Sequence, residues 1–134
     1  MSTNQQIIDR ALYDLGYLEY GASADATDSA DALNDLNVMM AAKEREEWEF
    51  NWFPQDTLGD TCPIPRWAEK GVVGNLAIEL SGTFNIAPTA QTVKKAADGE
   101  RVILNTMINL KLEGADMSHL PQGENLRYDI ETDA

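Results

Sequence analysis

The chain has 134 residues, of which 23 are acidic and 10 are basic, so it carries a formal net charge of −13 at pH 7. Its length suits a single domain with one core. Non-specific binding to nucleic acid or to an anionic membrane requires clustered Lys and Arg, and this charge excludes both. The only cysteine, Cys62, cannot form an internal disulfide. The N-terminus lacks a signal-peptide pattern, so we expect a cytosolic compartment.

The charge is unevenly distributed along the chain. Residues 1–60 hold 13 acids and 3 bases, residues 61–110 hold 4 and 5, and residues 111–134 hold 6 and 2. The nearly neutral middle part is therefore predicted to form the packed centre of the molecule. The negative charge is expected on the outer faces of the first helices and on the C-terminal segment.

Two amphipathic helices are predicted in the first part of the chain. In residues 3–15 apolar side chains recur at intervals of three and four, and Gly16 follows as a natural stop. A second helix follows a loop and runs to about Glu47, with its start capped by Asp25, Thr27 or Asp28. Its inward face is predicted to carry Ala30, Leu33, Leu36 and Met40.

An aromatic segment follows the second helix. Trp48, Phe50 and Trp52 alternate with polar residues, and this period of two predicts an extended segment that packs its rings on the core. Residues 55–65 contain prolines, a glycine and two aspartates, which is typical of a loop. Pro65 is well placed to begin a third helix, where its missing N–H costs nothing.

The third helix is predicted from Arg66 to about Ser81, with Gly82 closing it. It is apolar over most of its circumference, so we expect it to be central. Gly71 and Gly74 each cost about 1 kcal/mol relative to Ala in a helix interior, and they predict that another backbone packs closely against them. The inward stripe is Ala68, Val72, Leu76 and Leu80, with Val73 and Ala77 beside it.

A fourth helix is predicted from Pro88 to about Asn109, with Gly99 as its weak point. The residues expected to face inward are Val93, Ala97, Leu104 and either Met107 or Ile108. The helical period is lost in residues 111–134, which are predicted to form an extended arm. At roughly 3.3 Å per residue, such an arm spans up to about 79 Å and can reach another molecule.

The predicted fold class is mainly α, with little or no β-structure. Residues 1–110 are expected to form an antiparallel bundle of about four helices, and residues 111–134 form the extended arm. The predicted helical core consists of Leu12, Leu15, Leu33, Leu36, Met40, Val72, Leu76, Leu80 and Leu104.

The residue types that carry chemistry form no recognisable catalytic or metal-binding pattern. His119 is the only histidine, so a metal cluster or a catalytic triad would depend on it alone. Cys62 lies in a loop with only Arg66 as a nearby cation, and we expect an inert thiol. Asp56 and Asp60 lack the ligand series of a calcium loop. We therefore predict no catalytic residue, no bound metal, no cofactor and no enzyme activity.

The order of features along the chain resembles that of a known viral family. The segments that carry the resemblance are residues 8–16 (IDRALYDLG) and 30–40 (ADALNDLNVMM), then Pro65 with residues 75–80 (NLAIEL), and residues 120–125 (LPQGEN) near the C-terminus. Together with small residues in the fourth helix they cover residues 7–130. In this order they resemble the head-to-tail adaptor family of short-tailed bacteriophages, also called head completion or first tail accessory proteins.

The resemblance implies a structural virion protein and not an enzyme. Members of the family form a ring, usually of twelve copies, that binds beneath the portal protein, connects it to the tail and extends the DNA channel. The implied partners are the portal, further copies of the chain, and the tail nozzle, tail fibre or spike proteins below. DNA passes through without specific binding, no membrane is involved, and the ring sits at the head-tail junction of the virion after assembly in the host cytoplasm.

The family's C-terminal extension lies against the portal or a neighbouring subunit, which agrees with the predicted arm. The residues expected to make that contact are Leu120, Pro121, Leu126, Tyr128 and Ile130. The connection after the second helix is short, so a β-hairpin arm found in some relatives is reduced or missing here.

Two other functions fit the acidic composition. A cell-wall hydrolase would use two carboxylates that converge in a pocket, one of them with a raised pKa. A small acidic regulator would instead be a monomer or dimer that binds a basic partner through acids spaced along one strip.

Overall fold

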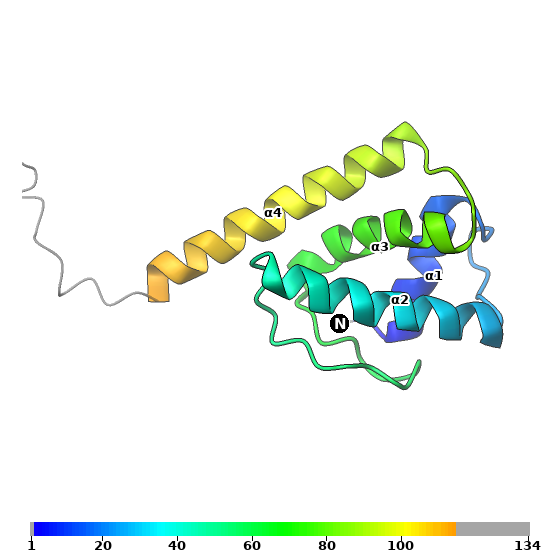
Figure 1. The fold of residues 1–134 in the computed structure, drawn as a ribbon, viewed down its shortest axis with the longest axis horizontal. Coiled ribbons are helices and arrows are strands. Elements are labelled where there is room, and N and C mark those ends of the chain that lie inside the picture. Colours follow the sequence, from blue (N-terminus) through cyan, green and yellow to red (C-terminus); the bar gives the residue numbers. More distant parts are fainter. Residues whose placement is uncertain (1, 115–134) are drawn as a thin grey trace, which may run out of the picture.

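The computed structural model describes residues 2–114, which fold as a helical bundle (Figure 1). This confirms the predicted mainly α class. The described part of the chain contains no β-sheet, only an isolated antiparallel bridge between Thr3 and Thr61. The elements in chain order are α1 (Asn4–Leu15), α2 (Ala26–Arg45), the short 3₁₀-helix η1 (Arg66–Ala68), α3 (Glu69–Thr83) and α4 (Ala90–Gly114).

Helix α1 begins and ends where the sequence predicts. The Thr3 hydroxyl accepts a hydrogen bond from the Gln6 N–H at 3.2 Å, and the Thr3 N–H donates to the Gln6 side chain at 2.9 Å, so the two residues form a capping box. At the other end Gly16 adopts the left-handed conformation (φ +90°) and its N–H bonds back to the helix. Local sequence signals therefore define both ends of α1.

Helix α2 is capped by Asp25, whose carboxylate accepts from the Asp28 N–H at 2.8 Å. It ends at Arg45, two residues before the predicted end, and Glu47 adopts a positive φ of 78° as the chain turns away. The prediction that Ala30 faces the core is wrong, because Ala30 is exposed and Ala32 is fully buried instead. The inward face of α2 is thus rotated slightly from the predicted one.

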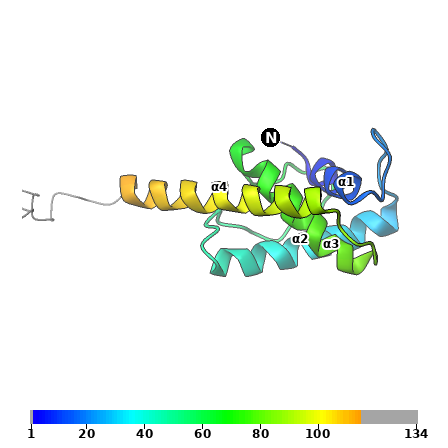
Figure 2. The same cartoon turned by 90° about the horizontal axis from the view of Figure 1, so that it is seen from above.

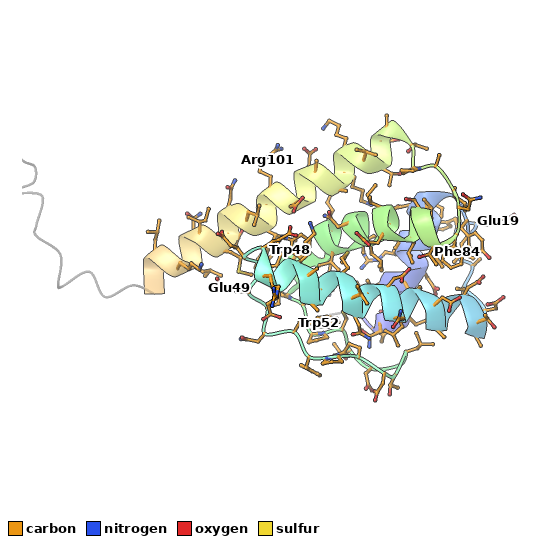
Figure 3. The ribbon with its side chains drawn as sticks, viewed as in Figure 1. Glu19, Trp48, Glu49, Trp52, Phe84 and Arg101 are labelled. Atoms are coloured by element: carbon orange, nitrogen blue, oxygen red, sulfur yellow. The ribbon has the colours of Figure 1, made fainter. Side chains whose placement is uncertain are left out.

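The segment after α2 lays its aromatic rings on the bundle as predicted. Trp48 is buried, and Phe50 and Trp52 are partly buried against the core. Figure 3 labels Trp48 and Trp52 in this segment. Asn37 of α2 holds the returning chain, because its side chain donates to the Gln55 carbonyl at 2.7 Å and accepts from the Gln55 N–H at 2.8 Å. The prediction that this segment is extended is wrong, because the Phe50 N–H donates to the Trp48 carbonyl at 3.0 Å in a tight turn and Asn51 has a positive φ of 55°. The turned segment nevertheless closes one side of the core.

Helix α3 lies at the centre of the bundle and contacts α1, α2 and α4 (Figures 1 and 2). Its contact with α4 is made by backbone, as the glycines predict. A Cβ on Gly71 would lie 2.7 Å from the Gly99 carbonyl oxygen, and a Cβ on Gly74 would lie 2.9 Å from the Ala96 Cα. The Asn75 side chain adds a hydrogen bond to the Ala96 carbonyl at 3.1 Å. Gly99 is thus the point of closest approach between two helices.

The predicted end of the third helix at Gly82 is wrong. Helix α3 continues to Thr83, and Asn85 supplies the positive φ of 58° that redirects the chain. Asn tolerates the left-handed region better than most residues with a side chain, so it replaces glycine in this role.

The inward face of α4 differs from the prediction. Met107, one of the two predicted alternatives, is buried, but Ala96 and Ile103, which were not predicted, are buried too, and Val93 and Ile108 are each 48% exposed. Ala97 is also exposed, and Leu104 is only partly buried. The remaining residues of the predicted core are all buried: Leu12, Leu15, Leu33, Leu36, Met40, Val72, Leu76 and Leu80.

Helix α4 also runs further than predicted. It continues through Gly114, beyond the expected boundary at residue 110, and its last turns project from the bundle (Figure 1). Two ion pairs hold it to the end of α2 and the segment that follows: Lys43 with Glu100 at 2.9 Å, and Glu49 with Lys111 at 2.7 Å. The rest of the predicted arm, residues 115–134, lies outside the described residues.

The glycine contact predicts a large and position-specific effect of adding one methyl group. We expect Gly99→Ala to destabilise the fold by about 3 kcal/mol, because the new Cβ would overlap the Gly71 backbone and force α3 and α4 apart. Gly82→Ala is the matched control, since a Cβ there meets nothing within 4 Å and replaces glycine inside a helix. It should stabilise by up to about 1 kcal/mol. Urea unfolding followed by circular dichroism measures both changes, and equal effects at the two positions would contradict the close approach.

Candidate functional site

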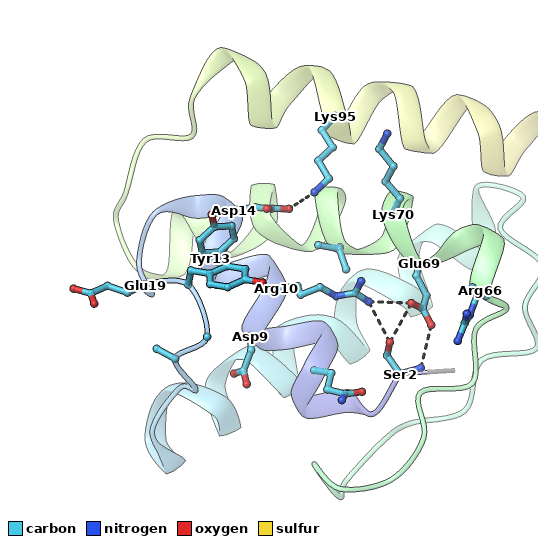
Figure 4. A pocket seen from close by; sticks show the side chains of 15 residues that line it. Ser2, Asp9, Arg10, Tyr13, Asp14, Glu19, Arg66, Glu69, Lys70 and Lys95 are labelled. Carbon is cyan, nitrogen blue, oxygen red and sulfur yellow. Dashed lines mark hydrogen bonds and ion pairs between the residues drawn. The ribbon is translucent and has the colours of Figure 1, made fainter.

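A polar groove of about 940 Å³ lies between α1, the start of α3, the first half of α4 and the loop that follows α1 (Figure 4). Its lining combines cationic and anionic side chains with two tyrosines. Its charged residues are the acids Asp9, Asp14, Glu19 and Glu69 and the bases Arg10, Arg66, Lys70 and Lys95. Four of the ten basic residues of the chain are therefore gathered in this one groove.

Glu69, in the first turn of α3, is the one buried acidic residue in the described part of the chain. Its carboxylate accepts from the Ser2 N–H at 3.0 Å, from the Ser2 hydroxyl at 3.1 Å and from the Arg10 guanidinium at 2.9 Å (Figure 4). Burial alone raises the pKa of Glu69, but these three donors outweigh it and hold the pKa below its ordinary value. The ionised carboxylate thus fastens both the N-terminal segment and α1 to α3.

A second polar link joins α1 to α4 at the other end of the groove. The Lys95 ammonium lies 2.6 Å from an Asp14 carboxylate oxygen, and the Thr92 hydroxyl donates to the Asp14 backbone carbonyl at 3.0 Å. The loop after α1 is held by Asp9, which accepts from the Ser23 hydroxyl at 2.9 Å and from the Ala24 N–H at 3.1 Å. These contacts keep the walls of the groove in place.

Two cations and two aromatic rings of the groove remain available to a ligand. Within residues 2–114 neither Arg66 nor Lys70 has an ion-pair partner. Tyr13 and Tyr20 are exposed and pack edge to face with ring centroids 5.8 Å apart. Such a surface suits recognition of a chain segment that carries carboxylates and apolar side chains.

The candidate contact residues of the sequence prediction are not placed. Leu120, Pro121, Leu126, Tyr128 and Ile130 lie outside the described residues, as does His119. Cys62 is fully buried, and burial, aided by the charge of Glu69, raises the pKa of its thiol to about 12. This protonated thiol is inert at neutral pH, in agreement with the sequence prediction.

A comparison of the chain with protein-family models and with curated proteins found no match. Within residues 2–114, no group of three or more His, Cys, Asp or Glu is arranged to hold a metal ion. No helix in this part of the chain has the length and apolarity that a membrane span requires.

The sequence prediction missed the groove because its parts are far apart in the chain. Arg10 and Glu69 are separated by 59 residues, and Asp14 and Lys95 by 81. No local pattern links such pairs. The sequence offered only a weak signal for a cationic surface. Four of the five bases of residues 61–110 come in two close pairs: Arg66 with Lys70, and Lys94 with Lys95.

Removing the charge of Glu69 is expected to weaken the fold and to change its response to acid. Glu69→Gln should cost about 1–2 kcal/mol at pH 7, because the charge-assisted bonds from Arg10 and Ser2 are lost. The folded-state pKa of Glu69 lies below its unfolded value, so its contribution is present above about pH 5 and disappears as the pH falls through the folded value. The variant should therefore lose less stability than the wild type on acidification.

Glu79→Gln provides the matched control, because Glu79 is an exposed acid of the same helix. Unfolding by urea at several values between about pH 3 and pH 7 measures both variants. Similar pH profiles for the Glu69 variant and the wild type would contradict the role given to this carboxylate.

Proposed function

We propose that the chain is a head-to-tail adaptor of a short-tailed bacteriophage, which assembles as a ring beneath the portal and connects it to the tail. The observation that carries the proposal is the projecting end of α4 (Figure 1). Ile108, Leu110 and Leu112 are each about half exposed or more on turns that extend past the bundle. A helix that presents large apolar side chains in this way suits a subunit that packs against other subunits.

The resemblance of residues 7–130 to the adaptor family supports the same function. The helical bundle found in the described residues is the architecture that the resemblance implies. The resemblance also supplies the expected number of twelve copies and the expected position between portal and tail. The contact with the portal or with a neighbouring copy is assigned to Leu120, Pro121, Leu126, Tyr128 and Ile130 of the C-terminal segment.

The net charge is compatible with a ring through which DNA passes. Twelve copies would each bring −13, and acids that face the channel would repel the duplex. Screening over roughly 8 Å at physiological salt confines this effect to the channel wall. The adaptor would therefore guide DNA without binding it, and no chemical step is required.

The geometry favours this function over the cell-wall hydrolase. A hydrolase of that kind needs a carboxyl group with a raised pKa as its general acid. Glu69 is buried in the groove, where such an acid is expected, but its pKa is lowered by Arg10 and Ser2. Its carboxylate is a structural acceptor.

The proposal predicts binding to a portal ring. We expect the purified full-length chain to join the portal protein encoded in the same genome as a ring of many copies, and light scattering with electron microscopy measures this. Tyr128→Ala combined with Leu126→Asp should abolish the binding, whereas Phe53→Ala, which changes an aromatic residue exposed on the described domain, should not. Absence of binding to the portal by the unmodified chain would refute the proposed function.

A further inference from the structure

Helix α4 carries two apolar stripes, and the bundle covers only one of them. Ala96, Ile103 and Met107 pack inward. The second stripe, here called the α4 flank, comprises Val93, Ala97, Arg101, Ile108 and Leu112, and all five are exposed. Val93, Ile108 and Leu112 are 48%, 48% and 60% exposed, so a large apolar area on one side of a helix has no partner within the described chain.

The same chain presents a second exposed helical surface that matches this flank. The outward side of α2, here called the α2 face, comprises Asp31, Asn34, Val38, Ala41 and Ala42. Val38 is 60% exposed, and the two alanines beside it allow another helix to approach closely. The α2 face is thus a shallow surface with one protruding apolar side chain.

The charges of the two surfaces are complementary. On the α4 side, Lys94 and Arg101 share a single acid, Asp98, at 2.8 Å and 3.0 Å, so one positive charge remains uncompensated. The Arg101 side chain points away from the bundle (Figure 3). On the α2 face the one charged residue is Asp31, which has no ion-pair partner in the described residues. In a chain of net charge −13, most pairs of surfaces on two copies repel each other, and this pair attracts.

The directions of the helices permit the match. Helices α2 and α4 run in the same direction, with α3 between them running the opposite way (Figure 1). If the α4 flank of one copy lies alongside the α2 face of the next, the two helices are parallel. The spacing from Arg101 to Ile108 and Leu112 then equals that from Asp31 to Val38 and Ala42, so Arg101 lies opposite Asp31, Ile108 opposite Val38 and Leu112 opposite Ala42.

We infer that the α4 flank of one copy binds the α2 face of a second copy, in parallel, with Arg101 near Asp31 and Ile108 near Val38. Because the two surfaces are different and both are present on every copy, the contact is head-to-tail, and repeating it by a rotation closes a ring. This inference specifies the contact between copies that the proposed function requires. The contact itself is argued from the two surfaces, and only the closure into a ring rests on the proposed function.

Engineered cysteines test the contact in the full-length chain. Val38→Cys combined with Ile108→Cys should, under mild oxidation, give a ladder of covalent dimers, trimers and higher multimers, since each copy supplies both halves of the bond. The native Cys62 does not interfere, because it is buried and its thiol pKa is raised. The control pairs Val38→Cys with Val102→Cys, because Val102 is 50% exposed on α4 but lies outside the flank. Only the first pair should give the ladder.

Reversal of the charges tests the register separately. In the Val38 and Ile108 cysteine background, Arg101→Asp should reduce multimer formation about fivefold, and adding Asp31→Arg to the same chain should restore it. Both side chains are exposed, so neither change disturbs the core. No restoration by the second change would overturn the Arg101–Asp31 register.

The outcomes separate this inference from the proposed function. A ring that assembles on the portal without the Val38–Ile108 ladder would overturn the contact and leave the adaptor function standing. Failure to bind the portal, with a ladder formed by the concentrated chain alone, would refute the adaptor function and support the contact. Equal ladders from both cysteine pairs would overturn the contact. So would the absence of a ladder from either pair, both in the presence and in the absence of the portal. An excess of an unrelated acidic protein should not suppress the ladder, and suppression would indicate a different occupant.

Discussion

The close contact between the backbones of α3 and α4 at Gly71 and Gly99 determines much of the remaining architecture. Two helices can approach so closely only where neither carries a Cβ, and the contact fixes which side of α4 faces inward. Ala96, Ile103 and Met107 are buried because they lie on the same side as Gly99. The Asn75 bond to the Ala96 carbonyl secures the same register with a polar contact. Everything on the other side of α4 is left for solvent or for another molecule.

The N-terminal half of the molecule is fastened to this central pair by polar contacts. Glu69 follows η1 directly, and its carboxylate accepts hydrogen bonds from Ser2 and Arg10. These bonds hold the N-terminal segment and α1 at the start of α3. Asp14 and Lys95 hold the other end of α1 to α4. The groove lies between these two links, which engage Glu69 and Asp14. Arg66 and Lys70 remain without an ion-pair partner within the described residues.

The number, type and approximate bounds of the helices could be predicted from the sequence, because they depend on local signals. Thr3, Gly16, Asp25 and Pro65 act through their own backbone or a neighbour two or three residues away. The inward face of α4 could not be predicted from hydrophobicity, since the helix has two apolar stripes of similar strength. Gly99 does identify the inward stripe. If Gly71 and Gly74 need another backbone close to them, the side of α4 that carries Gly99 must face α3. The groove depends on pairs separated by 59 and 81 residues, and only the fold brings these together.

The incorrect prediction for α4 therefore has a physical meaning. A helix packed in a monomer needs one apolar stripe, and a second stripe exposed to water lowers solubility without adding stability. The strong negative charge offsets this loss of solubility, because copies of the chain repel each other in solution. Copies therefore associate only through surfaces whose apolar groups meet apolar groups and whose charges meet opposite charges. On α4 the apolar groups of the flank stand beside Lys94 and Arg101, the cations that a strongly acidic copy would meet favourably. The two stripes of α4 thus have different roles. The inner stripe packs against the rest of the bundle, and the outer stripe determines which surface of a neighbouring copy binds.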